Sequence, residues 1–470
     1  MDLFLIILIV IVLYWRTINY HYLIDDIVRR WGYLLEIPDT SPPPDFYSSK
    51  PRKSRHLFLT LTHCVNVSII YFLWGWKAAL LFAMHPLSVS CTAWITGGYY
   101  QITVFFTLVT FYFISIFPGV WGILLGATFF TAALGSTVNC IAIPFIFLIQ
   151  PPITGLALMW PLFFYLTGRR FRIGFKKRNT GKGDKFSKGK FALMPKVLGY
   201  YIKMVLVPNK LAFFQDFGHE YGKNPQLTKK MESIDQLFWE SIGIFLVFAG
   251  IGFYLSPLGI LIFLAGIMPF TQWKVLGQFV AERYMYLPLI GFCLIVAQLP
   301  WPIVIVLAGT YLYRSNKYIP AFFDITALYR NGIEQFPNCV SNYVNLAERN
   351  LHLGKLFEAY KLLKQGLAID PDSFLCHANM AAYWISINKP EIAKYHTIKA
   401  MKNAENRGAA YNIFKNQLFH IMQGMKHMAE ARDKMDKVCK QCRVELGIET
   451  ETQQNKNDVI QEMNELCGIQ

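Results

Sequence analysis

Two adjacent carboxylates, Asp25 and Asp26, stand in a polar loop between hydrophobic segments of this 470-residue chain, and Arg29 and Arg30 follow them. A loop carboxylate can accept the proton of an attacking hydroxyl that lies within hydrogen-bond reach. Its neighbour can orient it or share a divalent cation with it. The pair therefore indicates general-base or metal-assisted attack on a lipid-phosphate donor at a membrane surface. The alternative is a solvated acidic turn after a helix, which is the usual fate of such a pair.

A second group of candidate residues follows the dipeptide His85-Pro86. The rings of Trp94, Tyr99 and Tyr100 could line a cavity together with the imidazole and dock a sugar. The alternative, and the commoner case, is a packed histidine at a helix end that the proline terminates.

The third candidate is the string AERYMYLP at residues 281–288, which opens a hydrophobic segment with Glu282, Arg283 and Tyr284. The guanidinium of Arg283 could hold a donor phosphate, because its fork matches phosphate oxygens with two parallel hydrogen bonds. The alternative is a Glu–Arg pair that anchors the helix at the membrane interface, with the tyrosines forming part of an aromatic belt.

Metal ligands are sparse in the sequence. Cys439 and Cys442 form a lone CxxC, and a zinc site would need a second pair of ligands at suitable spacing. The loop residues Asp216, His219 and Glu220 are more typical of a solvated cluster than of a catalytic one. We therefore predict no metal site, and the only cofactor that the sequence suggests is a divalent cation at the aspartate pair.

Composition predicts an integral membrane protein. Hydrophobic residues make up 54% of the chain and charged residues 16%, whereas about a quarter of the residues in an average soluble domain are charged. The start of the chain has no basic residues and no cleavage site, which favours a retained first helix over a signal peptide. We predict a multi-pass protein of the bacterial inner membrane or the endoplasmic reticulum. About eleven apolar segments could cross the bilayer, at residues 3–15, 57–74, 78–92, 102–116, 121–134, 140–148, 153–166, 237–255, 258–271, 284–298 and 303–313.

Charge lies on the loops of this sequence. The formal net charge is +16, and much of it falls at residues 29–55 and 169–190. Basic loops beside membrane segments favour contact with anionic headgroups or lipid phosphates, and no nucleic-acid motif accompanies them. Lys77 is the only Asp, Glu, Lys or Arg between residues 57 and 168. This argues against a transporter or channel, which usually carries ionisable groups inside its membrane helices.

The sequence beyond residue 315 has a soluble helical pattern with an internal repeat. Residues 345–347 (NLA) recur at 379–381 (NMA), and small residues recur with the same step of 34, as at Gly332, Gly366 and Ala400. A period of 34 is the length of a tetratricopeptide repeat (TPR). Gly354 falls at a predicted helix end, where a positive φ is favoured.

Together these features resemble the transmembrane and tetratricopeptide-repeat protein O-mannosyltransferases and their bacterial relatives, which have the GT-C glycosyltransferase architecture. The order of a first helix, a loop aspartate pair, an HP segment, the AERYMYLP string and C-terminal repeats carries the resemblance. It implies an all-α fold. A membrane bundle at 1–315, with a polar loop at 16–55 and a basic, interfacial loop at 169–235, precedes a TPR-like solenoid at 316–445 and a polar tail at 446–470.

The resemblance also implies a function. A polyprenyl-phosphate sugar would be the donor and a protein hydroxyl the acceptor, Asp25 and Asp26 would be catalytic, and the repeats would lie on the non-cytoplasmic side. The positive-inside rule points to the opposite orientation; we follow the resemblance.

The chain departs from the family where the HP segment usually continues to a glutamate, an arginine and an acidic residue. Ser90, Gly98 and Tyr100 stand at those places, and the Lys-Glu of a later family segment is replaced around residues 137–138. These departures sustain a second hypothesis, a non-catalytic membrane scaffold that assembles partner proteins through its repeats.

Overall fold

The computed structural model describes residues 2–23, 53–117, 119–149, 152–175, 188–217, 225–272 and 279–403. Within these ranges the chain forms helices and turns and no β-strand, which confirms the all-α class. The chain divides into two compact units, Met1–Asn379 and Met380–Gln470. The boundary falls inside the helix α19 (Phe374–Ser386).

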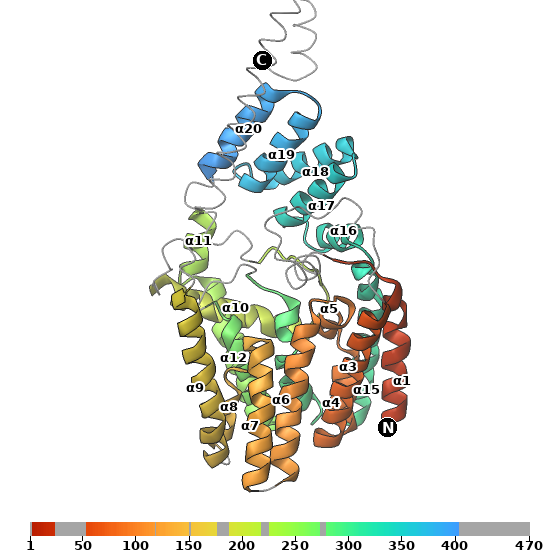
Figure 1. Ribbon diagram of the computed structural model, residues 1–470, viewed down its shortest axis with the longest axis vertical. Coiled ribbons are helices and arrows are strands. Elements are labelled where there is room, and N and C mark those ends of the chain that lie inside the picture. The colour runs from red at the N-terminus through yellow and green to blue at the C-terminus, as the bar shows by residue number, and fades with distance from the viewer. Residues whose placement is uncertain are drawn as a thin grey trace, which may run out of the picture. The chain divides into compact units, whose positions relative to one another are not determined.

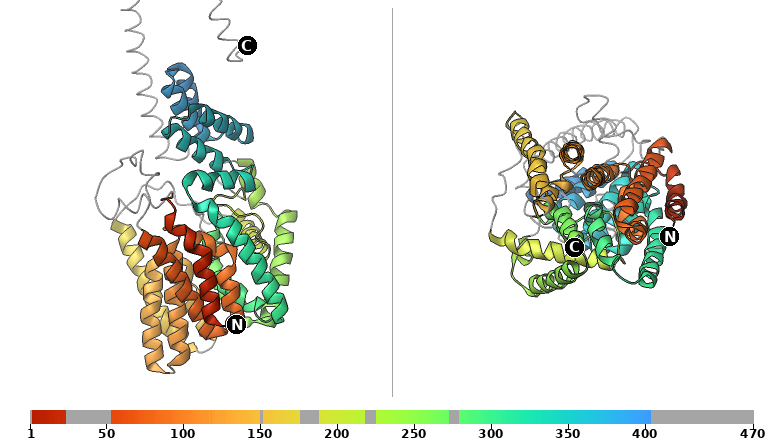
Figure 2. Two further views of the ribbon diagram at one scale, coloured as in Figure 1. Left: turned by 90° about the vertical axis from the view of Figure 1, so that its right-hand side faces the viewer. Right: turned by 90° about the horizontal axis from the view of Figure 1, so that it is seen from below.

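A bundle of helices makes up most of the first unit, and the long helices α1, α3, α6, α7 and α9 run along the vertical axis of Figure 1. In the view from below, several helices are seen along their axes (Figure 2). The elements of this part are α1 (Leu3–Tyr14), η1 (Trp15–Asn19), α3 (Lys53–Trp74), α4 (Trp76–Met84), η3 (Pro86–Ser88), α5 (Val89–Ala93), α6 (Gly98–Ile116), α7 (Val120–Ser136), η4 (Val138–Cys140), α8 (Ile143–Ile149), α9 (Pro152–Phe175), α10 (Lys188–Leu206), α11 (Pro225–Glu232), α12 (Gln236–Leu255), α13 (Pro257–Ile267), η5 (Met268–Phe270), η6 (Glu282–Met285), α14 (Pro288–Val296), α15 (Trp301–Tyr318) and η7 (Ile319–Phe322).

Three helices, α3, α6 and α12, are long and apolar enough to cross a membrane. Shorter apolar helices cover Leu3–Asn19, Val120–Ser136, Thr154–Phe163 and Pro257–Phe270. Large apolar side chains are exposed on the outer faces of several of these helices, among them Phe4, Trp121 and Tyr254. Contiguous exposed apolar surface is typical of contact with a membrane or another protein. The eleven crossings and their orientation stay predictions.

The predicted continuous segment at residues 78–92 is wrong. The helix α4 ends at Met84, His85 is extended with φ −68° and ψ 130°, and a new turn begins at Pro86. The residue before a proline is driven out of the helical region by the proline ring, and the proline itself has no N–H to donate. The predicted segment at 284–298 is also divided, into η6 and the nine-residue helix α14.

Local sequence explains where the helices α12 and α13 begin. Asp235 accepts a hydrogen bond from the backbone N–H of Phe238 (3.1 Å), and Ser256 accepts one from Gly259 (3.1 Å), with Pro257 in the first helical position. These are favoured N-cap arrangements, because a side-chain oxygen satisfies an N–H that has no partner within the helix. The buried ammonium of Lys196 on α10 also pairs with Asp235 at 2.9 Å, which attaches α10 to the start of α12.

Close glycine contacts fix the helix that follows η6. A Cβ placed on Gly291 in α14 would lie 2.3 Å from the Gly259 carbonyl oxygen in α13. A Cβ on Gly266 would lie 2.9 Å from the Pro288 ring. Small residues let helix backbones approach closely. The helices α13 and α14 therefore hold the preceding turn, η6, in one place.

The helix α16 (Ile325–Gln335) follows the bundle along the chain. Two helix pairs come after it in the described residues, α17 (Val340–His352) with α18 (Leu356–Ile369) and α19 with α20 (Pro390–Asn403). The bounds of α17 and α18 recur in α19 and α20 with a shift of 34 residues, the period that the sequence predicts.

The turns of the two pairs also match. Gly354 has φ +71° and Asn388, 34 residues later, has φ +59°. The next residue donates its N–H to a carbonyl five positions back in each case, from Lys355 to Asn350 and from Lys389 to Trp384. This is the Schellman arrangement, which requires the left-handed conformation that glycine and asparagine tolerate. The positive φ predicted for Gly354 is confirmed.

Candidate functional site

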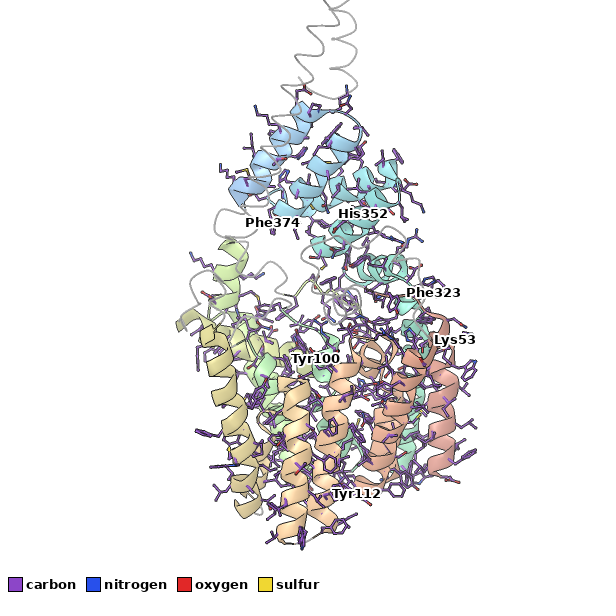
Figure 3. The ribbon with its side chains drawn as sticks, viewed as in Figure 1. Lys53, Tyr100, Tyr112, Phe323, His352 and Phe374 are labelled. Carbon is purple, nitrogen blue, oxygen red and sulfur yellow. The ribbon has the colours of Figure 1, made fainter. Side chains whose placement is uncertain are left out.

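Asp25 and Asp26 lie outside the described residues, as does the predicted cation site between them. The chain leading to them is attached to the end of η7, where the N–H of His21 donates to the Phe323 carbonyl (2.9 Å) and the Tyr20 ring packs on Phe323 (5.5 Å). Figure 3 places Lys53, Phe323 and Tyr100 toward one end of the bundle and Tyr112 toward the other. The described chain on both sides of the loop therefore lies at the Tyr100 end.

Glu282 is the buried carboxyl of this end of the bundle, with 3% of its surface exposed. Its Oε2 accepts a hydrogen bond from the Tyr318 hydroxyl (2.7 Å), and its Oε1 accepts one from Gln215 Nε2 (3.3 Å). The Tyr201 hydroxyl accepts the N–H of the preceding residue, Ala281 (3.1 Å), and so fixes the start of η6. Glu282 is thus the meeting point of α15, η6 and the segment that follows α10.

Burial raises the pKa of Glu282 from 4.5 to about 8. Hydrogen bonds from Tyr318, the Ala212 backbone and Gln215, and the charge of Arg283, act in the opposite direction but do not cancel burial. A carboxyl that is hard to ionise is neutral over much of the physiological pH range. Its position beside Arg283 therefore adds little negative charge to the site.

The raised pKa predicts a stability that depends on pH. A carboxyl whose pKa is higher in the folded state stabilises the fold fully below its unfolded pKa of 4.5, and that contribution is lost as the pH rises through about 8. The neutral variant Glu282→Gln should therefore have a higher free energy of unfolding than the wild type at pH 9, by on the order of a few kcal/mol. The difference should close toward pH 5. Thermal melting of the full chain in detergent measures this. Glu334→Gln, an exposed carboxyl on α16, is the matched control; parallel pH profiles for wild type and Glu282→Gln would contradict the prediction.

Arg283 is surrounded by aromatic rings. Its guanidinium carbon lies 5.4 Å from the ring centre of Trp94, 5.3 Å from that of Phe213 and 5.0 Å from that of Tyr284. Tyr100 interacts with the same side chain. A guanidinium within about 6 Å of a ring is attracted to its face. The rings therefore position a partly exposed cation that can bind an anion at the end of the bundle.

One buried donor next to this cation, the indole Nε1 of Trp94, has no hydrogen-bond partner among the described residues, and Trp94 is 1% exposed. The backbone at Gly97 packs closely against α5, because a Cβ on Gly97 would lie 2.5 Å from the Ser90 carbonyl oxygen. Buried donors without a partner are uncommon and call for a ligand or water.

His85 is a packed histidine at a helix end, and both of its ring nitrogens are used. Nδ1 accepts the N–H of Leu87 (3.2 Å), so Nε2 carries the proton and donates to the Val205 carbonyl (3.1 Å). The ring centre lies 4.3 Å from that of Tyr311. His85 therefore ties α4 to α10 and α15 and offers no ring nitrogen to a ligand.

The structure brings Trp94, Tyr100, Arg283 and Tyr284 together out of the predicted binding residues. The Tyr284 ring stacks on Phe270 at 4.0 Å and lies 6.0 Å from the Tyr100 ring. Tyr99 is half-buried in the first turn of α6, where its carbonyl accepts the Thr103 hydroxyl.

Sequence reasoning missed three residues that build this site, namely Phe213, Gln215 and Tyr318. Phe213 and Gln215 belong to a segment that has no helical period and passes between elements distant in sequence. The stretch LAFFQDF, at 211–217, carries no period or motif that could have found them.

Uncharged polar groups continue from the site into the bundle. His63 Nδ1 and the Tyr286 hydroxyl are 2.7 Å apart, and Asn66 Nδ2 donates to the Gln101 carbonyl (3.2 Å). Gln101 Nε2 in turn donates to the Thr92 hydroxyl (2.8 Å). This network joins α3, α5 and α6, and within the described residues Asn66 Oδ1 and Gln101 Oε1 remain without a partner.

No group of three or more His, Cys, Asp or Glu residues in the described ranges could hold a metal ion. Asp216 is described, whereas His219, Glu220 and the pair Cys439 and Cys442 lie outside these ranges.

Apolar cavities open on the flank of the bundle along α10. One, of about 500 Å³, is lined by α8, α10 and α13, and another, of about 380 Å³, by α10 and α12. They share Met194, Leu198 and Thr271. The two adjoin and form one apolar groove, which we call the α10 groove.

Comparison of the chain with family models, with curated proteins and with solved structures gives no match.

Proposed function

We propose that this protein is a membrane glycosyltransferase that moves a sugar from a polyprenyl-phosphate donor to a protein hydroxyl. The observation that carries the proposal is the Arg283 site, a cation held by aromatic rings beside one unpartnered donor, the Trp94 indole N–H. These groups match the phosphate and sugar of such a donor, because guanidinium pairs with phosphate oxygens and aromatic faces dock sugars.

In the proposed reaction, the acceptor hydroxyl loses a proton and polyprenyl phosphate is the leaving group. The acceptor oxygen forms a bond to the anomeric carbon of the sugar, and the bond from that carbon to the phosphate oxygen breaks. Asp25 or Asp26 takes the acceptor proton, and Arg283 stabilises the charge of the departing polyprenyl phosphate. The apolar α10 groove offers a surface for the isoprenoid chain.

The helix pairs with the 34-residue period are proposed to be TPR-like repeats that present the acceptor protein on the non-cytoplasmic side. Stacked repeats make extended concave surfaces that suit a protein partner. The repeated helix bounds and the matching turns at Gly354 and Asn388 support this assignment.

Transfer in a reconstituted system tests the proposal. The full-length protein in liposomes is supplied with polyprenyl-phosphate hexoses that carry a radiolabelled sugar, including the mannose form, and with extracted membrane and secreted proteins as acceptors. Label should enter protein in an alkali-labile, hydroxyl-linked form. Label confined to lipid with every donor, for protein that is folded by its melting curve, would contradict it.

A second function, a non-catalytic scaffold, is favoured by the packing at Gly98. A Cβ there would lie 2.3 Å from Leu59 Cδ2. The place of the family's arginine is thus occupied by a core side chain. A scaffold would copurify with a fixed set of proteins in the absence of donor, and replacing Asp25 and Asp26 would leave that set unchanged.

A further inference from the structure

The segment 211–217, which we call the strap, lies between the helices α16 and α17 and the Arg283 site. On the helix side, Asn331 Nδ2 donates to the Leu211 carbonyl (2.9 Å) and Asn342 Nδ2 donates to the Phe214 carbonyl (3.3 Å). Ala212 packs into a buried cluster with Phe336 and Cys339. The strap is therefore held from this side by two side-chain amides and by an apolar contact.

The other face of the strap builds the site. The Phe213 ring lies edge-on to Trp94 at 5.0 Å and also faces the Arg283 guanidinium. Gln215 Nε2 donates to Glu282, and Gln215 Oε1 accepts the Tyr200 hydroxyl (2.9 Å). Two of the buried groups that surround Arg283 and Glu282, Phe213 and Gln215, thus depend on where the strap lies.

Successive side chains of the strap contact its two sides in turn. Ala212 and Phe214 contact the helix side, where the Phe214 ring lies parallel to Tyr329. Phe213 and Gln215 contact the site. The asparagine bonds to the strap backbone therefore hold both sets of contacts in place.

We propose that Asn331 and Asn342 are positioning residues: through the strap, the helices α16 and α17 hold Phe213 against Trp94 and Arg283 and thereby set the geometry of the anion site. The effect on sugar transfer rests on the proposed function, whereas the effect on the geometry does not.

Isosteric variants test the inference in the full-length protein in lipid nanodiscs. Asn331→Asp and Asn342→Asp keep the side-chain shape and remove the N–H donor. Asn338→Asp, an exposed asparagine between α16 and α17, is the control for added charge. Gly332→Ala perturbs the same contact from the opposite helix, because a Cβ there would lie 2.4 Å from Asn342 Oδ1.

The first readout is hydroxyl-radical footprinting of Trp94 and Phe213, followed by mass spectrometry. Losing one such hydrogen bond should raise labelling of both rings about fivefold, in Asn331→Asp, Asn342→Asp and Gly332→Ala but not in Asn338→Asp. Asn331 is half-buried, so Asn331→Asp is expected to fold. Unchanged labelling of Trp94 and Phe213 in this variant would overturn the inference. An equal rise in labelling in the control Asn338→Asp would also overturn it.

The second readout is the kinetics of transfer in the reconstituted system. The asparagine variants should raise the donor KM and leave kcat near the wild-type value, because they misplace groups that bind the donor in both ground and transition state. A fall in kcat alone would contradict a positioning role at the anion site. If no protein transfers sugar at all, the footprinting result still decides the structural inference while the proposed function fails.

Discussion

Transfer should fall to background when Asp25 and Asp26 are each replaced by asparagine. The amide cannot accept the acceptor proton, and loss of a general base typically costs about 10²–10⁴-fold in rate. The measurement is initial-rate transfer from the labelled polyprenyl-phosphate sugar, with the double variant beside each single one. The single variant that loses more activity identifies the base, and the other aspartate then orients it or shares a cation with it.

The matched control for this pair is Asp39→Asn, a carboxylate farther along the same loop. It removes one charge from the loop without touching the pair. Wild-type rates in both Asp25→Asn and Asp26→Asn would reject the mechanism. Restoration of their activity by excess divalent cation would shift the role of the pair from base to metal ligand.

Arg283→Gln should weaken donor binding strongly. A hydrogen bond to a charged group is worth about 1.5–3 kcal/mol, which is roughly a 10- to 150-fold loss of affinity. Arg283→Lys keeps the charge but loses the planar fork and its stacking on Trp94 and Phe213. The affinity of this variant for the donor should therefore lie between those of the wild type and Arg283→Gln. Binding of polyprenyl phosphate alone, without sugar, measures how much the Arg283 guanidinium contributes to the affinity for the phosphate.

Arg330→Gln provides the control for Arg283→Gln, because Arg330 is exposed on α16. Added salt should weaken binding to the wild type more than to Arg283→Gln, since screening acts on the charge that the variant lacks. Unchanged affinity in a folded Arg283→Gln protein would place the donor phosphate elsewhere. A loss of equal size in Arg330→Gln would reduce the effect to general surface charge.

Much of the fold could be predicted from the sequence because its signals are local. Apolar runs predicted the helices α3, α6 and α12. The helix bounds of the later pairs recur with the predicted 34-residue step, and Gly354 adopts the positive φ that its place in the repeat suggested. The apolar runs and the turn glycine are read from neighbouring residues, and the repeat is read by comparing the sequence with itself.

The prediction of one segment at 78–92 was wrong because it gave the apolar run more weight than Pro86, which lies within it. An apolar run gives no information about backbone hydrogen bonds, whereas a proline removes one and restrains its neighbour. The break turns His85 inward to Val205, and beyond the short helix α5 the Trp94 ring lies against Arg283. A local rule that the sequence already contained thus reshaped the candidate site.

The sequence by itself determined the all-α class, the apolar character of the bundle, the period of the repeats and the types of residue that could bind a phosphate or a sugar. Only the tertiary structure decided which of them meet. Trp94, Phe213 and Arg283 are separated by about 70 to 190 positions in the chain and are adjacent in space. Such contacts arise when elements pack together, and no period or local propensity encodes them. The strap illustrates the reason most clearly, because its residues have no secondary structure of their own and take their positions from Asn331, Asn342 and Glu282.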